Sequence, residues 1–434
     1  MAYRIGSARA EITPPLSVPY LGISPRHCPF TGVHDPLWIR AVHLATDDGA
    51  VAIIDADLIG LADTLLGPGR RFTAEIKAEI GRATGLAPAE ILLAAAHIHS
   101  TPDTLDFRPL REAPGALAWL EGLKAKITAA VVAARTQAFQ AKLRSGQIDF
   151  PGYARNRRHE PCLDESVKLL QFTAVDSGRK ILLMSYACHP VIVQVQSLVS
   201  GDFVGAAQRG VEHTLNGCDA CLFLQGASGD INPRMDDSRD FGDVEGFGAA
   251  LAERIVALSA ALTRSEGNAE PVHLAAALEE LALPSRDLPS AEATAKLRAE
   301  TLDLQTELAV GKVSRPPAVQ SERARMTEEK LARIAEGGGV FGAPVQAIRV
   351  GNSVLVAIPG EPMCRMGQEI SQRCEPLRGI TVGCANGYLG YIVSPESWQR
   401  GGYEVELGPW SKVGPESYRL ILEAVGRLKA KIGS

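Results

Sequence analysis

The stretch from Ile91 to Asp103, ILLAAAHIHSTPD, constrains the fold more than any other part of the chain. Its apolar start predicts a buried strand, and Pro102 prevents that strand from continuing. His97 and His99 follow the apolar residues, and alternate residues of a strand face the same side. Ligand sites of α/β proteins lie at the carboxyl ends of strands. The stretch therefore predicts two imidazoles that share a metal site or, as the alternative, two histidines held by ordinary hydrogen bonds.

The composition is that of a folded globular protein. Of the 434 residues, 46% are hydrophobic and 22% are charged, and the net charge is -5 with both signs interspersed. We therefore expect no nucleic-acid partner. The N-terminal sequence MAYRIGSARAEITPP has neither the basic opening nor the apolar core of a signal peptide, so we expect no membrane anchor and a cytoplasmic protein.

Apolar runs alternate with helical periodicity, which predicts an α/β fold in which helices flank a mixed β-sheet. Strands are expected near 5, 38–45, 51–56, 91–96, 181–188, 220–224, 272–283, 345–350, 353–358 and 380–384. Helices are expected at 73–84, 115–143 (one helix or two), 201–216, 244–263, from 363, and 415–431. Because no repeat or disordered linker divides the chain, we predict one domain over 1–434.

The segment 288–338 differs in composition from its surroundings, and this composition predicts a helical hairpin inserted into the domain. Two stretches rich in Ala, Glu, Arg and Lys are separated by Arg315-Pro316-Pro317. The hairpin is a candidate lid or a contact within a homo-oligomer; a solvated appendage is the alternative.

Two further strand ends carry candidate ligands. His189 follows the run 181–188, and Glu361 follows the run 353–358 within a PGEP turn. Together with His97 they supply two nitrogens and one carboxylate, a set that suits catalytic zinc. Asp55 and Asp57 lie at the end of another strand. One of them is expected to hold a histidine in place by a hydrogen bond or, as the alternative, both are ordinary carboxylates that face a loop.

Two loops complete the candidate site. The small-residue loop 226–233 can bring backbone N–H groups to an oxyanion, although a tight turn explains it equally well. Arg155, Arg157 and Arg158 either aim a guanidinium at a substrate oxygen or are solvated surface charge.

Taken in order, eight short motifs resemble the catalytic N-terminal domain of the neutral/alkaline non-lysosomal ceramidase family over nearly the whole chain. They are IGSARAEITPP, GVHDPLWIRA, the H-x-H followed by Ser-x-Pro, the Asn-Arg pair, the strand ending in His-Pro, the G-D-x-x-P loop, PGE, and NGYLGY with a later GYE.

The resemblance implies a zinc ion held by His97, His189, Glu361 and Tyr391. His99 would stand beside the metal as an acid/base or orienting group, and Arg157 would contact the substrate or the oxyanion. The resemblance further implies catalytic roles in the loop for Gly229 and Asp230, and substrate contacts for Asn156, Asn232 and Tyr388.

Two departures from the family pattern shape the expected function. Asn232 stands where the family has a serine, which favours metal-activated water over a serine nucleophile. The chain also ends near residue 434, without the family's C-terminal β-sandwich. We therefore expect a zinc-dependent hydrolase of a small soluble amide: an N-acyl amine, an N-acyl amino acid or a lactam.

Three alternatives stay open. An ester or lactone hydrolase could use the same zinc, because both reactions pass through a tetrahedral intermediate. A non-catalytic metal-binding protein would saturate its ion with protein ligands. An amidohydrolase-type (β/α)8 barrel also uses H-x-H at a strand end, but its histidines belong to the first strand.

Overall fold

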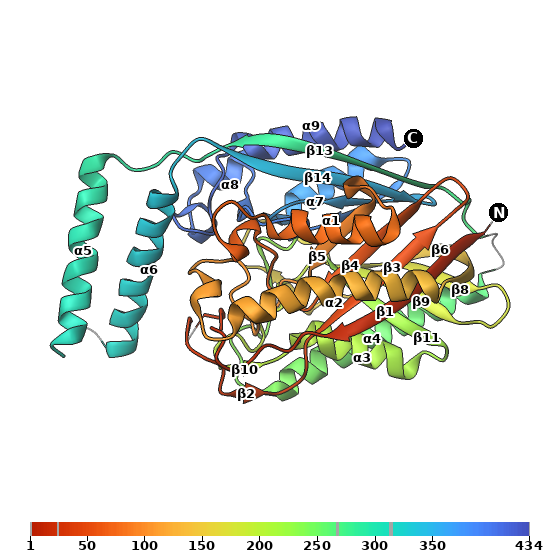
Figure 1. Ribbon diagram of the computed structural model, residues 1–434, viewed down its shortest axis with the longest axis horizontal. Helices are drawn as coiled ribbons and strands as arrows, with labels where there is room; N and C mark the ends of the chain where they lie inside the picture. The colour runs from red at the N-terminus through yellow and green to blue at the C-terminus, as the bar shows by residue number, and fades with distance from the viewer. Residues whose placement is uncertain (1, 24–25, 266–268, 312–315, 434) are drawn as a thin grey trace.

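The computed structural model describes residues 2–23, 26–265, 269–311 and 316–433, and it has the predicted α/β fold. Figure 1 shows a body of sheets and helices from which two helices, α5 and α6, project to one side. The short elements are β2 (Gly32–Val33), β7 (Ala154–Asn156), β10 (Leu198–Val199), β12 (Ile231–Pro233), β16 (Glu361–Pro362), β18 (Tyr391–Ile392) and α8 (Pro395–Gln399).

The larger sheet has eight strands in the order β11-β9-β8-β6-β1-β3-β4-β5. Its strands are β1 (Tyr3–Glu11), β3 (Trp38–Ala45), β4 (Ala50–Ala56), β5 (Ile91–Ala95), β6 (Phe139–Asp149), β8 (Ser166–Ala174), β9 (Lys180–Tyr186) and β11 (Cys218–Gln225). The pairs β4–β5 and β9–β11 are parallel and the other pairs are antiparallel. This mixed pattern excludes the (β/α)8 barrel, whose strands are all parallel.

A second sheet packs against the inner face of the first. It contains β13 (Leu274–Pro284), β14 (Val340–Val350), β15 (Ser353–Ala357) and β17 (Arg378–Val382) in chain order, with β15 and β17 parallel. Ile348, Leu355 and Ile380 of this sheet share one buried cluster with Val42 and Leu222 of the larger sheet. The sequence predicted these strands, but not that they form a separate layer.

Helices cover the outer faces of both sheets. On the larger sheet, α2 (Ala116–Thr136) packs on β1 and β3 with α1 (Phe72–Thr84) beside it, and α3 (Asp202–Thr214) and α4 (Phe241–Arg264) cover the strands from β6 to β11. On the smaller sheet lie α7 (Cys364–Cys374) and α9 (Glu416–Lys431) (Figure 1). Among the described residues, α4 alone is long and apolar enough to cross a membrane, but Phe247, Leu251 and Ile255 on it lie in the core.

The predicted helix 115–143 is wrong at its C-terminal end, because α2 ends at Thr136 and β6 begins at Phe139. Ala141 and Leu143 are buried and alternate with exposed or half-buried neighbours, which is the period of a strand. The Ala-rich helix before them masked this change of period.

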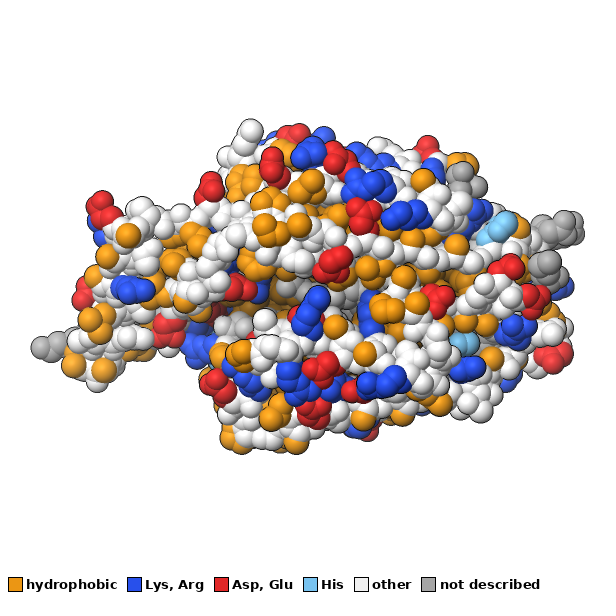
Figure 2. All heavy atoms as spheres, turned by 45° about the horizontal axis from the view of Figure 1, so that its top comes forward, with side chains coloured by type: hydrophobic (Ala, Val, Ile, Leu, Met, Phe, Trp, Pro, Cys, Tyr) orange, Lys and Arg blue, Asp and Glu red, His pale blue; other side chains and the backbone are white. Residues whose placement is uncertain are grey.

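The inserted hairpin consists of α5 (Ala291–Ala309) and α6 (Pro317–Glu336), between β13 and β14. Arg315 of the predicted connection lies outside the described residues. The organisation of 1–434 as one domain, and the role of the hairpin as a lid or oligomer contact, stay predictions. Figure 2 shows basic and acidic side chains interspersed over one face of the molecule, with no field of a single sign there.

The larger sheet curls until its two edges approach each other. The Asp55 carboxylate on β4 accepts hydrogen bonds from the Phe223 N–H of β11 (2.9 Å) and from Gln208 (2.8 Å). Asp57 accepts from the Trp38 N–H (2.8 Å). Both carboxylates are fully buried, and their partners are these groups and Arg40 rather than a histidine, so the expectation that they hold a histidine or face a loop is wrong. Instead, Asp55 joins the sheet edges and thereby brings the ends of β5 and β11 together.

Candidate metal centre and cleft

The carboxyl ends of strands from both sheets meet at one place. His97 follows β5, His189 follows β9, and Glu361 begins β16 just after β15. The His97 and His189 ring centroids are 4.9 Å apart. Glu361 Oε2 lies 3.2 Å from His97 Nε2 and 3.1 Å from His189 Nε2. The structure therefore brings together three of the four residues expected to hold the metal.

Backbone carbonyls fix the tautomers of two of these histidines. His97 Nδ1 lies 2.7 Å from the Ile59 carbonyl oxygen, and His189 Nδ1 lies 2.7 Å from the Ser228 carbonyl oxygen. A carbonyl oxygen only accepts, so each Nδ1 carries a proton, and in the neutral imidazole each Nε2 presents a lone pair. These two lone pairs face the Glu361 carboxylate. Three acceptors that converge in a buried site require a positive charge between them.

The charges of the site agree with that requirement. Burial lowers the pKa of His97, but Cys384 and Glu361 outweigh it and raise that pKa well above its ordinary value. Burial likewise opposes ionisation of Glu361, yet His97 and His189 hold its pKa well below the ordinary range. Burial lowers the pKa of His189 to about 4. The centre thus combines an ionised carboxylate with imidazoles that compete for one positive charge.

His99 belongs to the same group. One nitrogen each of His97, His99 and His189 lie within 4.8 Å of one another. Both ring nitrogens of His99 are buried without a hydrogen-bond partner among the residues that the structure describes. Burial, together with the charges of His97 and His189, lowers the pKa of His99 well below its ordinary value. His99 is therefore neutral, and it is a candidate ligand as well as the acid/base or orienting group that was expected.

Strand β5 does not deliver His97 and His99 in the way that the alternation predicted. β5 ends at Ala95, and His97 has a left-handed backbone with φ of 66°. The chain turns away from the sheet at this point. His97 and His99 nevertheless meet, with ring centroids 5.1 Å apart, because the loop after β5 folds back on the end of β9.

Tyr388 supports Glu361 and does not form a wall of the cleft. Its hydroxyl donates to Glu361 Oε1 over 2.6 Å. Burial raises the pKa of Tyr388 well above its ordinary value, so the donor proton stays in place. The predicted contact of Tyr388 with the substrate is therefore wrong. The motif NGYLGY contains both tyrosines, but the sequence does not indicate which of them contacts the Glu361 carboxylate.

Tyr391 lies beside the centre, paired in β18 with Glu361 of β16. Its hydroxyl accepts a hydrogen bond from Arg157 Nη2 (3.0 Å), and in the described parts of the chain it makes no hydrogen bond to a histidine or to Glu361. Burial raises its pKa well above the ordinary value. Its role as a metal ligand stays a prediction.

Arg157 is held by several acceptors at once. It donates to Glu404 Oε1 (2.9 Å), the Gly229 carbonyl oxygen (2.8 Å) and Asn232 Oδ1 (3.2 Å) in addition to Tyr391. Arg157 and Asn232 both line the cleft described below, which places them where the sequence expected substrate contacts. Arg155 and Arg158 line the same cleft, where Arg158 binds Glu404 and Glu160 and Arg155 binds Asp236.

Three other expected site residues hold loops together. The Gly229 N–H donates to the Pro362 carbonyl oxygen (3.0 Å), so its predicted role as an oxyanion donor is wrong. The Asp230 carboxylate accepts hydrogen bonds from the Cys364 N–H (2.8 Å) and from the Asn156 side chain (2.7 Å). These bonds join the segments that contain Asp230 and Asn156 to the start of α7. With its amide also bonded to backbone groups, Asn156 does not reach the cleft. Backbone pairing of this kind leaves no signature in sequence.

A cleft of about 640 Å³ opens onto the histidine group. His99, Arg157, Asn232 and Tyr391 line it, and so do several residues that the sequence did not single out, among them Arg26, Gln194, Val191 and Tyr403. His99 belongs both to this lining and to the metal group. A ligand in the cleft therefore reaches the candidate metal centre through His99.

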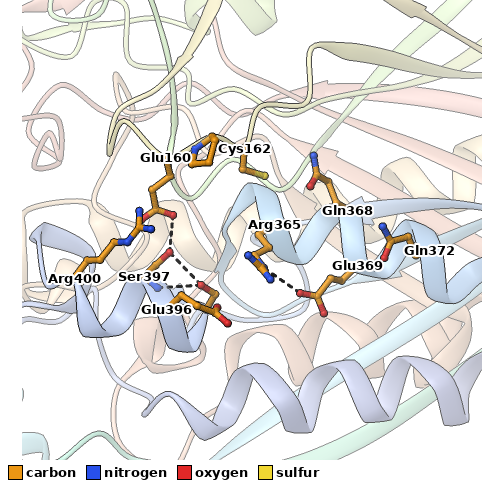
Figure 3. Close-up of a pocket in the computed structure, with 11 residues that line it drawn as sticks. Glu160, Cys162, Arg365, Gln368, Glu369, Gln372, Glu396, Ser397 and Arg400 are labelled. Atoms are coloured by element: carbon orange, nitrogen blue, oxygen red, sulfur yellow. Dashed lines mark hydrogen bonds and ion pairs between the residues drawn. The ribbon is translucent and has the colours of Figure 1, made fainter.

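A second cavity, of about 520 Å³, shares Glu160 and Arg400 with the lining of this cleft (Figure 3). Its polar groups bond one another: Ser397 donates to Glu160 (2.6 Å), and Arg365 donates to Glu369 (3.4 Å). None of the candidate metal ligands lines it. The chemistry of the molecule is therefore assigned to the first cleft.

Two sheets layered between helices, with buried imidazoles and a carboxylate beneath a polar cleft, define an α/β protein with a candidate metal centre. Among solved structures the chain is similar to neutral ceramidase from Pseudomonas aeruginosa, with a TM-score of 0.74 and 16% identity, over 100% of this chain and 75% of that one. It is also similar to a ceramidase complexed with C2, with a TM-score of 0.73, 14% identity and the same coverage.

This likeness establishes a shared fold and confirms the fold that the resemblance in sequence implied. Neither the models of known families nor the sequences of curated proteins give a match.

Proposed function

We propose that the protein is a zinc-dependent hydrolase that cleaves the carbon–nitrogen bond of a small amide. The ceramidase-like fold supports this proposal, since a ceramidase cleaves an amide bond. The candidate substrates are N-acyl amines, N-acyl amino acids and lactams.

The observation that carries the proposal is the convergence of acceptors on one point. Glu361 Oε2 lies 3.2 Å from His97 Nε2 and 3.1 Å from His189 Nε2, while both Nδ1 protons are committed to carbonyls. A divalent cation satisfies all three groups, and a set of nitrogen and oxygen donors suits zinc. His99 and Tyr391 are the candidates for a further ligand. When bound, such an ion lowers the pKa of a water molecule to about 7 and polarises a carbonyl group.

The remaining residues supply binding and proton transfer. His99 borders the cleft, and neither of its ring nitrogens has a hydrogen-bond partner among the described residues, so its imidazole can hydrogen-bond to a water molecule or to the leaving nitrogen and orient proton transfer there. Arg157, fixed by Glu404, Asn232 and Gly229, holds the Tyr391 hydroxyl and presents positive charge to an oxyanion in the cleft.

The cleft itself favours an enzyme over a metal-storing protein. A storage site encloses its ion, whereas here a cavity of about 640 Å³ reaches one member of the histidine group. A small organic substrate fits such a volume.

The test is an activity screen of zinc-reconstituted protein against amides of the three classes and against matched esters and lactones. We expect amide turnover that a chelator abolishes and that His97→Ala eliminates. If the zinc-loaded protein turns over esters or lactones alone, the alternative hydrolase is correct. If it binds zinc and cleaves none of these compounds, the proposed function is wrong.

A further inference from the structure

Arg26 places a buried guanidinium with unfilled hydrogen-bond donors in the wall of the cleft, where Glu329 is its ion-pair partner. Its side chain is only 6% exposed. Its Nε–H donates to the Gly22 carbonyl oxygen (2.9 Å), but Nη1 is buried without a hydrogen-bond partner in the described ranges of the chain. The nearest carboxylate oxygen, Glu329 Oε2 of α6, stands 3.6 Å from Nη1. A buried guanidinium with unfilled donors is costly unless a ligand completes it.

The other buried arginines of the cleft are committed to protein groups. Arg157 donates to four acceptors, as described above, and Arg158 donates to two carboxylates and two backbone carbonyls. Glu329 faces Arg26 with Oε2 at 3.6 Å, beyond hydrogen-bond distance, while His27 (3.1 Å) and Arg325 (2.5 Å) both contact Oε1, so three basic side chains share this one carboxylate. Among the buried cleft arginines that the structure describes, Arg26 thus has the most N–H donors left for a ligand.

Gln194 adds an unfilled acceptor to the same wall. It is 4% exposed, and its Nε2 donates to Asp237 Oδ1 (2.7 Å). Because a carboxylate only accepts, this bond fixes the amide orientation, and Oε1 is left buried without a partner among the described residues. The lining of the cleft therefore offers a cationic hydrogen-bond donor, Arg26, and a neutral acceptor, Gln194 Oε1.

Backbone hydrogen bonds fix this wall beside His99. The Gly22 N–H donates to the His99 carbonyl oxygen (3.1 Å), and the Ile23 N–H donates to the Gln194 carbonyl oxygen (2.9 Å). Arg26 and Gln194 are consequently held on segments that are tied to each other and to the histidine that links the cleft to the metal group.

We propose that Arg26 and Gln194 form a recognition subsite for an amide that carries a carboxylate next to the scissile bond. Arg26 binds the carboxylate, and Gln194 Oε1 accepts the amide N–H. This inference rests on the proposed function and narrows its substrate class to N-acyl amino acids. Val191 and Tyr403 supply apolar surface to the acyl chain.

The test compares two ligands that differ only in the carboxylate, N-hexanoylglycine and N-methylhexanamide, on zinc-loaded protein. Selectivity is the ratio of kcat/KM values where turnover occurs and the ratio of Kd values from calorimetry where it does not. A charge-assisted hydrogen bond corresponds to a preference of about 10- to 100-fold for the glycine derivative. We expect Arg26→Gln to remove this preference. Arg400→Gln, whose side chain is 61% exposed, should change it by less than about threefold because solvent screens the charge.

Equal affinity of the wild-type protein for both ligands would overturn the subsite, as would a folded Arg26→Gln variant that keeps the preference. If Arg26→Gln does not fold, Arg26→Lys is the second variant, and the preference must fall because lysine lacks the bidentate fork. Zinc-loaded protein that binds the glycine derivative selectively but cleaves none of the compounds in the activity screen would refute the proposed function and leave the subsite standing.

Discussion

Removing the Tyr388 hydroxyl should weaken metal binding without unfolding the protein. The hydroxyl donates to Glu361 Oε1 over 2.6 Å, while the other oxygen of this carboxylate faces His97 and His189. Tyr388→Phe keeps the ring and removes one hydrogen bond to a buried charged group, which contributes about 2 kcal/mol. If that contribution supports the carboxylate in its binding position, zinc Kd should rise about 30-fold.

The assay is competition for zinc with a chromogenic chelator at pH 7, together with thermal unfolding of the zinc-free protein. Tyr418→Phe is the matched control, because Tyr418 is equally buried and donates to Glu369 Oε1 (2.9 Å) on α7, where no candidate metal ligand lies. The control should leave zinc affinity unchanged. Equal zinc affinity in wild type and Tyr388→Phe would refute the role assigned to Tyr388.

Three further predictions concern other parts of the molecule. His189→Ala should lose zinc, as measured by elemental analysis, whereas His213→Ala on the exposed side of α3 should retain it. Equal loss of zinc in both variants would mean that the wrong histidines were assigned to the metal. Gly229→Ala should lower the unfolding midpoint and weaken zinc binding, because the added Cβ would stand 2.8 Å from the Glu361 carbonyl oxygen. Gly122→Ala is the control: an added Cβ has nothing within 4 Å there, so this variant should be neutral or stabilising. Equal changes of the unfolding midpoint in the two variants would contradict the packing argument. Burial lowers the pKa of Lys77 from 10.5 to about 7, so the unfolded chain binds more protons between these values and this residue makes stability rise with pH across that window. Lys77→Met should remove this rise in denaturant titrations, and an unchanged pH profile would refute it.

Local patterns predicted the parts of the site that depend on one strand and its end. The apolar run before His97, the run before His189 and the PGE turn at Glu361 each combine a buried strand with a polar residue just beyond it, and the structure joins all three. Strand ends are predictable because burial and termination are both encoded within about ten residues.

What the sequence did not predict depends on contacts between distant segments. The separate second sheet follows from strand pairing, which a period-two pattern does not specify. The Gly229 N–H was expected to face an oxyanion, yet the Glu361 loop uses it. Arg26 belongs to none of the motifs quoted above, and it reaches the cleft because the loop after β1 binds the backbone of His99.

The most direct test of the account is an anomalous-scattering experiment on zinc-soaked crystals, with data collected on both sides of the zinc absorption edge. The account predicts one edge-dependent peak, bounded by His97 Nε2, His189 Nε2 and Glu361 Oε2 and open toward the cleft. A fully zinc-loaded protein with no peak among these three atoms, or with its peak elsewhere, would contradict it.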